Sequence, residues 1–211
     1  MTLQLGDIAP NFHAETTDGP LTFHEWSGES WVLLFSHPAD FTPVCTTELG
    51  RVAQLKPEFA KRNVKLICIS VDTMEHHQAW VSDIGETQGT AVNFPIIADP
   101  ERKIALDYDM IHPNASATAS VRAVYLIDPE KRIRLILIYP MAAGRNFDEI
   151  LRATDAIQYG DDFSVATPVN WQRGDDVIIP LSIDDETAKT KFPKGWHAPK
   201  PYLRITPDPS A

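Results

Sequence analysis

The stretch that decides the fold runs from residue 31 to residue 50 and reads WVLLFSHPADFTPVCTTELG. Its first six residues form an apolar run that predicts a buried strand. Thr42 is a good helix N-cap, and Pro43 is a residue preferred at the first helical position. The stretch therefore predicts a strand, a short loop and a helix, with Val44 and Cys45 in the first helical turn.

Further apolar runs rich in Val, Ile and Leu predict strands at residues 64–71, 121–127 and 133–139. Helical patterns cover residues 45–60, where Pro57 is expected to kink or interrupt the helix, residues 73–88, and a segment that begins at Asn146. The last two strands are joined through Asp128-Pro129-Glu130-Lys131, which indicates an antiparallel hairpin. We therefore expect an α/β fold with a central mixed sheet flanked by helices.

The composition of the chain changes near Tyr159, after which proline is frequent and long helical patterns are absent. This change predicts a domain at residues 1–158 and a C-terminal extension at residues 159–211. We expect the extension to be an extended appendage packed on a partner subunit.

The overall composition restricts the classes of function. The chain has 211 residues, of which 43% are hydrophobic, so it can bury a core. A net charge of -10 argues against nucleic-acid binding, which depends on basic groups. The longest apolar stretch, residues 135–143, is far shorter than the ~20 residues of a membrane helix. The first residues carry neither a basic start nor an apolar signal core, so we expect a cytoplasmic protein.

The two cysteines of the chain lie in different local patterns. At a helix start, free N-H groups and the helix dipole would stabilise a thiolate at Cys45, which is a standard route to a reactive cysteine. The alternative is that Cys45 is only a small apolar residue. Cys68 alternates with Val64, Leu66 and Ser70 along a predicted strand, so we expect it to be structural. Without a Cys-x-x-Cys pair, dithiol exchange is disfavoured.

The segment Pro38-Ala39-Asp40-Phe41-Thr42-Pro43-Val44-Cys45 resembles the Pro-x-x-x-Thr-x-x-Cys motif of the peroxiredoxins. The wider SHPADFTPVCTTELG is similar to the one-cysteine branch of that family, which includes mammalian peroxiredoxin 6. The similarity continues through KPEFAKRNVKLICISVD, YPMAAGRNFDEILR, ATPVNW and FPKGW, and so covers nearly the whole chain. The resemblance implies a thioredoxin-like fold and a homodimer or higher oligomer to which the C-terminal arm contributes.

The resemblance also implies roles for individual residues. Cys45 corresponds to the peroxidatic cysteine, Thr42 to the hydroxyl that contacts peroxide, and Pro38 to the residue that shields the site. Arg122 corresponds to the active-site arginine, whose fixed charge favours the thiolate. From the residues alone, Arg122 could equally be a surface charge on an edge strand.

Other residues match a supporting network. Glu48 and Arg145 correspond to charged residues that orient Arg122 and hold the loop. His37 corresponds to a histidine beside the reactive cysteine, where it could hydrogen-bond the sulfur or its oxidised form. From the residues alone, a lone histidine is more often structural. The N-H groups of Val44 and Cys45 at the helix start complete the expected site.

The implied reaction reduces hydrogen peroxide and organic hydroperoxides through a Cys45 sulfenic acid, as an antioxidant thiol peroxidase. It requires no metal and no organic cofactor. An external thiol, either glutathione or a small thiol protein, would restore the cysteine. The alternative is a redox sensor or holdase chaperone, which would consume about one peroxide per cysteine rather than many.

Two further sequence patterns give weaker indications of a functional site. Gly28-Glu29-Ser30-Trp31-Val32 resembles the lipase stretch of the branch but has Val32 where a Gly-x-Ser-x-Gly elbow needs glycine, so lipid hydrolysis is not expected. His24 is retained, but Glu130 stands at the aspartate position. The adjacent His76 and His77 would point about 100° apart on a helix, which is a poor chelate, and we expect a solvated helix face.

Overall fold

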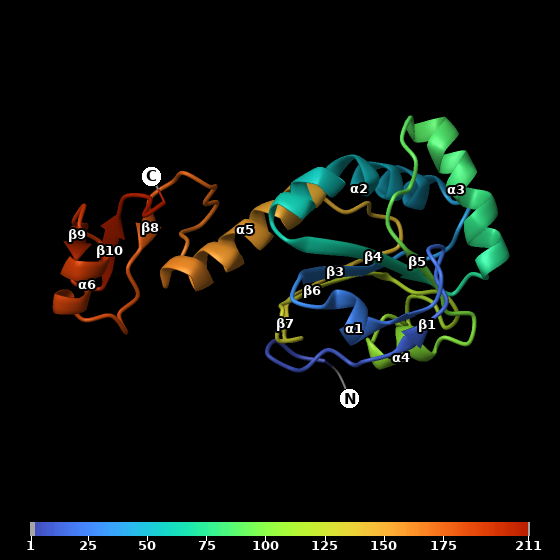
Figure 1. Ribbon diagram of the computed structural model, residues 1–211, viewed down its shortest axis with the longest axis horizontal. Helices are drawn as coiled ribbons and strands as arrows, with labels where there is room; N and C mark the ends of the chain where they lie inside the picture. The colour runs from blue at the N-terminus through green and yellow to red at the C-terminus, as the bar shows by residue number, and fades with distance from the viewer. Residues whose placement is uncertain (1–2, 211) are drawn as a thin grey trace. The chain divides into compact units, whose positions relative to one another are not determined.

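The computed structural model describes residues 3–210. The chain forms two compact units, Met1–Phe147 and Asp148–Ala211, and each is described by itself (Figure 1). The division predicted from composition at residue 158 stays a prediction.

The first unit is built on a five-stranded mixed sheet with the strand order β5-β4-β3-β6-β7. These strands are β3 Trp31–Ser36, β4 Val64–Ser70, β5 Ile96–Ala98, β6 Arg122–Ile127 and β7 Ile133–Tyr139. β3, β4 and β5 run parallel, whereas β6 is antiparallel to both β3 and β7. The predicted mixed sheet and the predicted hairpin are confirmed.

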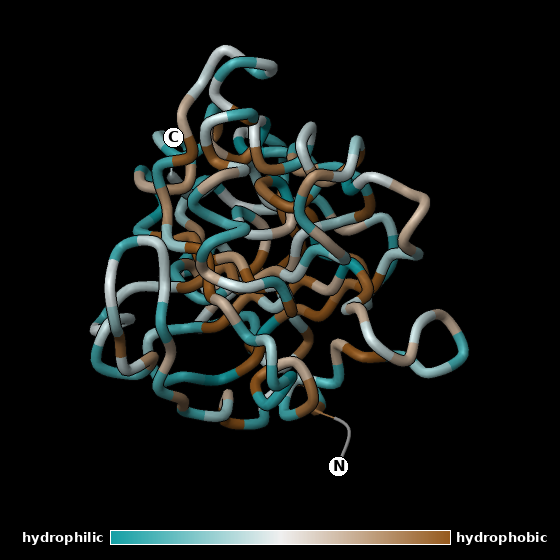
Figure 2. The backbone as a smooth tube through the Cα atoms, turned by 90° about the vertical axis from the view of Figure 1, so that its right-hand side faces the viewer, coloured by the Kyte–Doolittle hydropathy of each residue, from teal (hydrophilic) through white to brown (hydrophobic). Residues whose placement is uncertain are grey.

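Helices cover both faces of this sheet. α2 Pro43–Lys61 lies over one face and packs against α3 Met74–Gln88, while α1 Phe23–Ser27 and α4 Lys103–Asp107 lie beneath the other (Figure 1). A short ribbon of β1 His13–Ala14 and β2 Leu21–Thr22 completes the unit. Figure 2 shows the backbone coloured by hydropathy, with hydrophobic segments toward the middle of the view and many outlying loops hydrophilic.

Pro57, which was expected to kink or interrupt α2, does not interrupt it, since the helix is continuous across this residue. A proline lacks the N-H that would bond the carbonyl four residues earlier, which here belongs to Ala53. The Nδ2 group of Asn93 donates to that carbonyl oxygen at 3.3 Å. A side chain from outside the helix therefore replaces the lost hydrogen bond.

The second unit contains the greater part of α5 Phe147–Phe163, together with α6 Asp185–Lys191. β8 Val177–Ile178, β9 His197–Lys200 and β10 Leu203–Thr206 form a three-stranded sheet in the order β8-β10-β9. Its apolar cluster comprises Tyr159, Val165, Trp171, Val177, Ile179, Ala188 and Phe192. The tail is therefore a small folded unit and not the extended appendage that we expected. None of the described helices is long and apolar enough to cross a membrane.

The close packing of α2 on α3 gives a stability prediction. A Cβ added at Gly50 would lie 2.5 Å from the Cβ and Cγ of Gln88, whereas nothing lies within 4 Å of one added at Gly85. Gly50→Ala should lower the free energy of unfolding by about 1–2 kcal/mol because the helices must move apart. Gly85→Ala should raise it by about 0.5–1 kcal/mol, as alanine favours a helix. Urea unfolding of both variants measures this, and equal effects would contradict the packing argument.

Candidate active site

Cys45 lies in the first turn of α2, directly after the loop that follows β3. Thr42 is the N-cap residue with extended backbone angles, φ -113 and ψ 145, and Pro43 follows at the helix start. The N-H of Thr46 donates to the carbonyl of Thr42 at 3.0 Å. The N-H groups of Val44 and Cys45 precede that bond and have no intrahelical acceptor. The predicted helix start is confirmed.

The hydroxyl of Thr42 does not cap the helix. It donates instead to the carbonyl of Ala39 at 2.9 Å, within the loop. A hydroxyl that has given its one proton still offers oxygen lone pairs as acceptors. Thr42 therefore keeps an acceptor three residues before Cys45, while Pro38 is buried in the same loop and Val44 is half-buried.

Arg122, at the start of β6, brings a positive charge to the sulfur. Its Nη1 group lies 3.3 Å from Cys45 Sγ and 2.7 Å from Glu48 Oε2. Its Nε group donates to the carbonyl of Met141 at 2.9 Å, and the side chain is buried. The alternative interpretation from the sequence, that Arg122 is a surface charge on an edge strand, is therefore wrong.

Arg145 and Glu48 form a second buried ion pair beside the first. Arg145 donates to Glu48 Oε1 from its backbone N-H at 2.7 Å and from Nε at 3.0 Å, and to Oε2 from Nη2 at 2.8 Å. Burial acts to raise the pKa of Glu48, but the hydrogen bonds and charge of Arg145, with the charge of Arg122, outweigh it and lower that pKa. One ionised carboxylate thus holds two guanidinium groups.

His37 contacts a different sulfur from the one expected. Its Nδ1 atom lies 3.1 Å from the Sγ atom of Cys68, and its Nε2 atom lies 2.7 Å from Asp40 Oδ1. Burial lowers the pKa of His37, although Asp40 acts in the opposite direction. Cys68 lies in β4 without solvent exposure, as predicted for a strand residue, and burial raises the pKa of its thiol well above the usual range.

The expectation of a solvated helix face fits His76 but is wrong for His77. The side chain of His76 is 62% exposed, whereas that of His77 is 0% exposed. His77 Nδ1 lies 2.6 Å from Asp40 Oδ2, and its Nε2 lies 3.1 Å from the carbonyl oxygen of Ile97. The buried residues of α3 are His77, Trp80 and Ile84, which recur at helical spacing on one face. This spacing from the apolar residues was the sequence signal that could have predicted the burial of His77.

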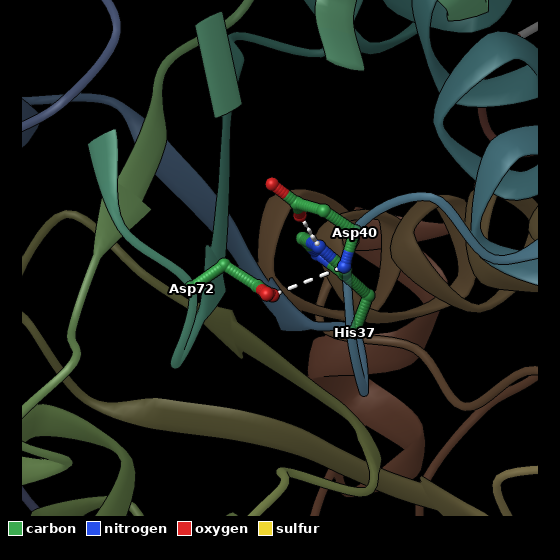
Figure 3. Close-up of side chains that lie close together, drawn as sticks. All are labelled: His37, Asp40 and Asp72. Atoms are coloured by element: carbon green, nitrogen blue, oxygen red, sulfur yellow. Dashed lines mark hydrogen bonds and ion pairs between the residues drawn. The ribbon is translucent and has the colours of Figure 1, made fainter. Parts of the chain in front are cut away.

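Asp40 is the centre of this second cluster, which sequence reasoning missed. Its backbone N-H donates to Asp72 Oδ2 at 3.0 Å (Figure 3). Polar atoms of His37, Asp40 and Asp72 lie within 4.8 Å of one another, a spacing that could hold a metal ion. Both Asp40 oxygens face histidine nitrogens, so we interpret the group as a hydrogen-bonded cluster. Burial acts to raise the pKa of Asp40, but the two histidines outweigh it and lower that pKa.

The residues of the broken lipase stretch are engaged elsewhere. Ser30 Oγ donates to Asn63 Oδ1 at 2.9 Å, and His24 Nε2 lies 2.8 Å from the carbonyl oxygen of Ala9. These contacts give Ser30 and His24 local structural partners.

Comparisons with known proteins identify the families and relatives that this chain resembles. The AhpC/TSA family model matches residues 5–136, and the model for the C-terminal domain of 1-Cys peroxiredoxin matches residues 156–195. A 1-Cys peroxiredoxin of Dictyostelium discoideum is 50% identical over 208 residues, which are 99% of this chain and 86% of the relative.

Two solved structures share the fold over nearly the whole chain. A yeast mitochondrial 1-Cys peroxiredoxin, studied for thiol resolution via the glutathione/thioredoxin systems, superposes with a TM-score of 0.93 at 50% identity and covers 98% of this chain and 100% of its own. A cysteine-to-serine mutant of peroxiredoxin 6 from Arenicola marina gives a TM-score of 0.91 at 45% identity, covering 99% of this chain and 100% of its own.

The ion cluster gives a prediction with a defined pH dependence. Glu48→Gln leaves both guanidinium groups without their counter-charge, so the free energy of unfolding at neutral pH should fall by about 3 kcal/mol or more. The folded pKa of Glu48 lies below its ordinary value of 4.5, so the stabilisation is complete above that value and is lost as the pH falls below it. Urea unfolding at a series of pH values should show the parent and the variant converging on acidification. A constant difference would contradict the role of the charge.

Proposed function

The chain belongs to the AhpC/TSA family and, within it, to the one-cysteine peroxiredoxins, and on this premise we propose that Cys45 is the cysteine that reduces peroxide. The protein is a thiol peroxidase, as its close relatives are. The observation that carries the assignment is the Nη1 group of Arg122 at 3.3 Å from Cys45 Sγ. A fixed positive charge at that distance favours the thiolate, which is the reactive form.

The reaction is a two-electron oxidation of the Cys45 sulfur. The thiolate attacks the terminal oxygen of a hydroperoxide, a sulfur-oxygen bond forms, and the oxygen-oxygen bond breaks. The departing oxygen takes a proton and leaves as water or as an alcohol, while the cysteine becomes a sulfenic acid. Hydrogen peroxide and organic hydroperoxides share this chemistry.

Several groups beside the sulfur support this reaction. The Thr42 hydroxyl oxygen accepts a hydrogen bond from the peroxide, and Pro38 shields the site from water. Arg122 and the N-H groups at the start of α2 stabilise the charge that moves onto the departing oxygen. Glu48 acts through Arg122, because it accepts a hydrogen bond that fixes the orientation of Arg122, and Arg145 in turn holds Glu48.

An external thiol completes the cycle. The second cysteine of the chain, Cys68, is buried in β4, and burial raises the pKa of its thiol, so it is a poor resolving group. The yeast mitochondrial relative is described as resolved via the glutathione/thioredoxin systems. We assign the same chemical class of reductant, glutathione or a small thiol protein, to this chain.

Assembly and location belong to the same proposal. β7 is an edge strand whose residues are mostly half-buried, and Ile138 on it is 47% exposed, which supports a homodimer or a higher oligomer. We propose a cytoplasmic location, while the mitochondrial yeast relative sets organelle targeting as the alternative. Light scattering and imaging of the tagged protein test these two points.

The first test separates the two cysteines. Cys45→Ser should abolish peroxide reduction, and Cys68→Ser should keep most of it, since only Cys45 has the helix start and Arg122 beside it. Peroxide consumption with excess glutathione or a small thiol protein measures both variants. Comparable losses in the two would remove the assignment, and a parent that consumed about one peroxide per chain would indicate a sensor instead.

The second test concerns recycling. One equivalent of peroxide without thiol should add one oxygen to Cys45, and excess peroxide should add a second and a third. Added glutathione should intercept the first product as a mixed disulfide on Cys45. Intact-mass and peptide mass spectrometry distinguish these species. A Cys45-Cys68 disulfide as the main product would instead require an internal resolving step.

A further inference from the structure

The buried cluster of His37, Asp40 and His77 has no part in the chemistry proposed for Cys45. His37 and Asp40 belong to the loop between β3 and α2, and His77 belongs to α3. The side chains of His37 and His77 are 0% exposed, and that of Asp40 is 1% exposed. Buried ionisable groups are costly to retain, so their contacts indicate what they hold in place.

Asp40 ties the loop to two other elements at once. Its carboxylate oxygens lie 2.7 Å from His37 Nε2 and 2.6 Å from His77 Nδ1, which connects the loop to α3. Its backbone N-H donates to Asp72, just after β4. Asp72 Oδ2 in turn accepts from Ser70 Oγ at 2.7 Å. The loop is therefore bound through both side chain and main chain.

Both histidines of the cluster are engaged at both ring nitrogens. The Nδ1 atom of His77 lies 2.6 Å from Asp40 Oδ2, and its Nε2 atom lies 3.1 Å from the carbonyl oxygen of Ile97. His37 gives its Nε2 proton to Asp40, so its Nδ1 accepts from the thiol of Cys68. Each polar atom of the cluster thus has a partner.

The loop needs this support because its backbone is strained. Phe41, between Asp40 and Thr42, has φ 53, a left-handed conformation that is unfavourable for a bulky residue. Phe41 is 52% exposed, so burial of its ring does not supply the compensation. The neighbouring Asp40 is held through both its side chain and its main chain.

We propose that Asp40 and His77 are positioning residues for peroxide reduction, which hold the strained loop so that Pro38 and Thr42 stand at the Cys45 sulfur. This inference rests on the proposed peroxidase site. Neither residue touches peroxide; each acts through the loop. Because reacting groups displaced by about 1 Å can lose up to about a hundredfold in rate, a loosened loop lowers the peroxide rate without removing the thiolate.

A pair of variants at His77 tests the proposal. His77→Asn places an amide N-H near the position of Nδ1 and can keep the bond to Asp40, whereas His77→Gln places one near Nε2 and can keep only the bond to Ile97. The rate of Cys45 oxidation by hydrogen peroxide should fall about tenfold or more in His77→Gln and about threefold or less in His77→Asn. Alkylation of Cys45 by iodoacetamide, which needs the thiolate but not Thr42, should not fall in either.

A second pair covers the case in which a buried variant fails to fold. Asp72→Asn keeps an oxygen acceptor for the Asp40 N-H, and Asp72→Ala removes it from a half-buried position. Only Asp72→Ala should slow oxidation by peroxide while leaving alkylation intact. Glu86→Gln, at an exposed position of α3, is the control and should match the parent.

The outcomes distinguish the two proposals. Equal losses in His77→Asn and His77→Gln, a parent rate in His77→Gln or Asp72→Ala, or a parallel fall in alkylation would overturn the positioning role while the parent still reduces peroxide. A parent in which peroxide does not oxidise Cys45 would overturn the proposed site as well.

Discussion

The structure around the sulfur depends on one buried carboxylate. Glu48 accepts hydrogen bonds from Arg122 on β6 and from Arg145, which precedes α5, so a single charge on α2 joins three separate segments. Two guanidinium groups buried side by side would repel each other without it. The Nη1 group of Arg122 that donates to this carboxylate also contacts the Cys45 sulfur. Placement of the reactive group and stability of the fold are therefore consequences of the same ion cluster.

Sequence reasoning succeeded where the physics is local. The strand at residues 31–36 and the helix start at Thr42 and Pro43 depend on neighbouring residues only, and both are confirmed. It failed where a distant partner decides: α2 passes through Pro57 because Asn93, far along the chain, bonds the carbonyl that the proline leaves free. The folded tail was missed because its strands are too short to show a period.

The residues of the site were likewise predicted in part. The resemblance identified Arg122, Glu48 and Arg145, and the structure brings them together although they are remote in sequence. It could not place His77, because a histidine next to another histidine carries no burial signal of its own. Only the inward stripe of α3, which it shares with Trp80, reveals its side. The contacts of His77 with the loop before α2 and with β5 join segments remote in sequence, so they require the three-dimensional arrangement.

Cys45 is completely buried, so the two halves of the proposed catalytic cycle differ in how much room the reacting molecule needs to reach the sulfur. A small hydroperoxide needs little room, whereas a glutathione molecule or a thiol protein must bring its own sulfur into line with that of Cys45. With Cys45 as the proposed reactive cysteine, the approach of a thiol would need a wider local opening at the start of α2 than the approach of a peroxide, and so would draw more on local unfolding. Osmolytes or any added rigidity at the helix start would consequently lengthen the life of the sulfenic acid and favour its further, irreversible oxidation.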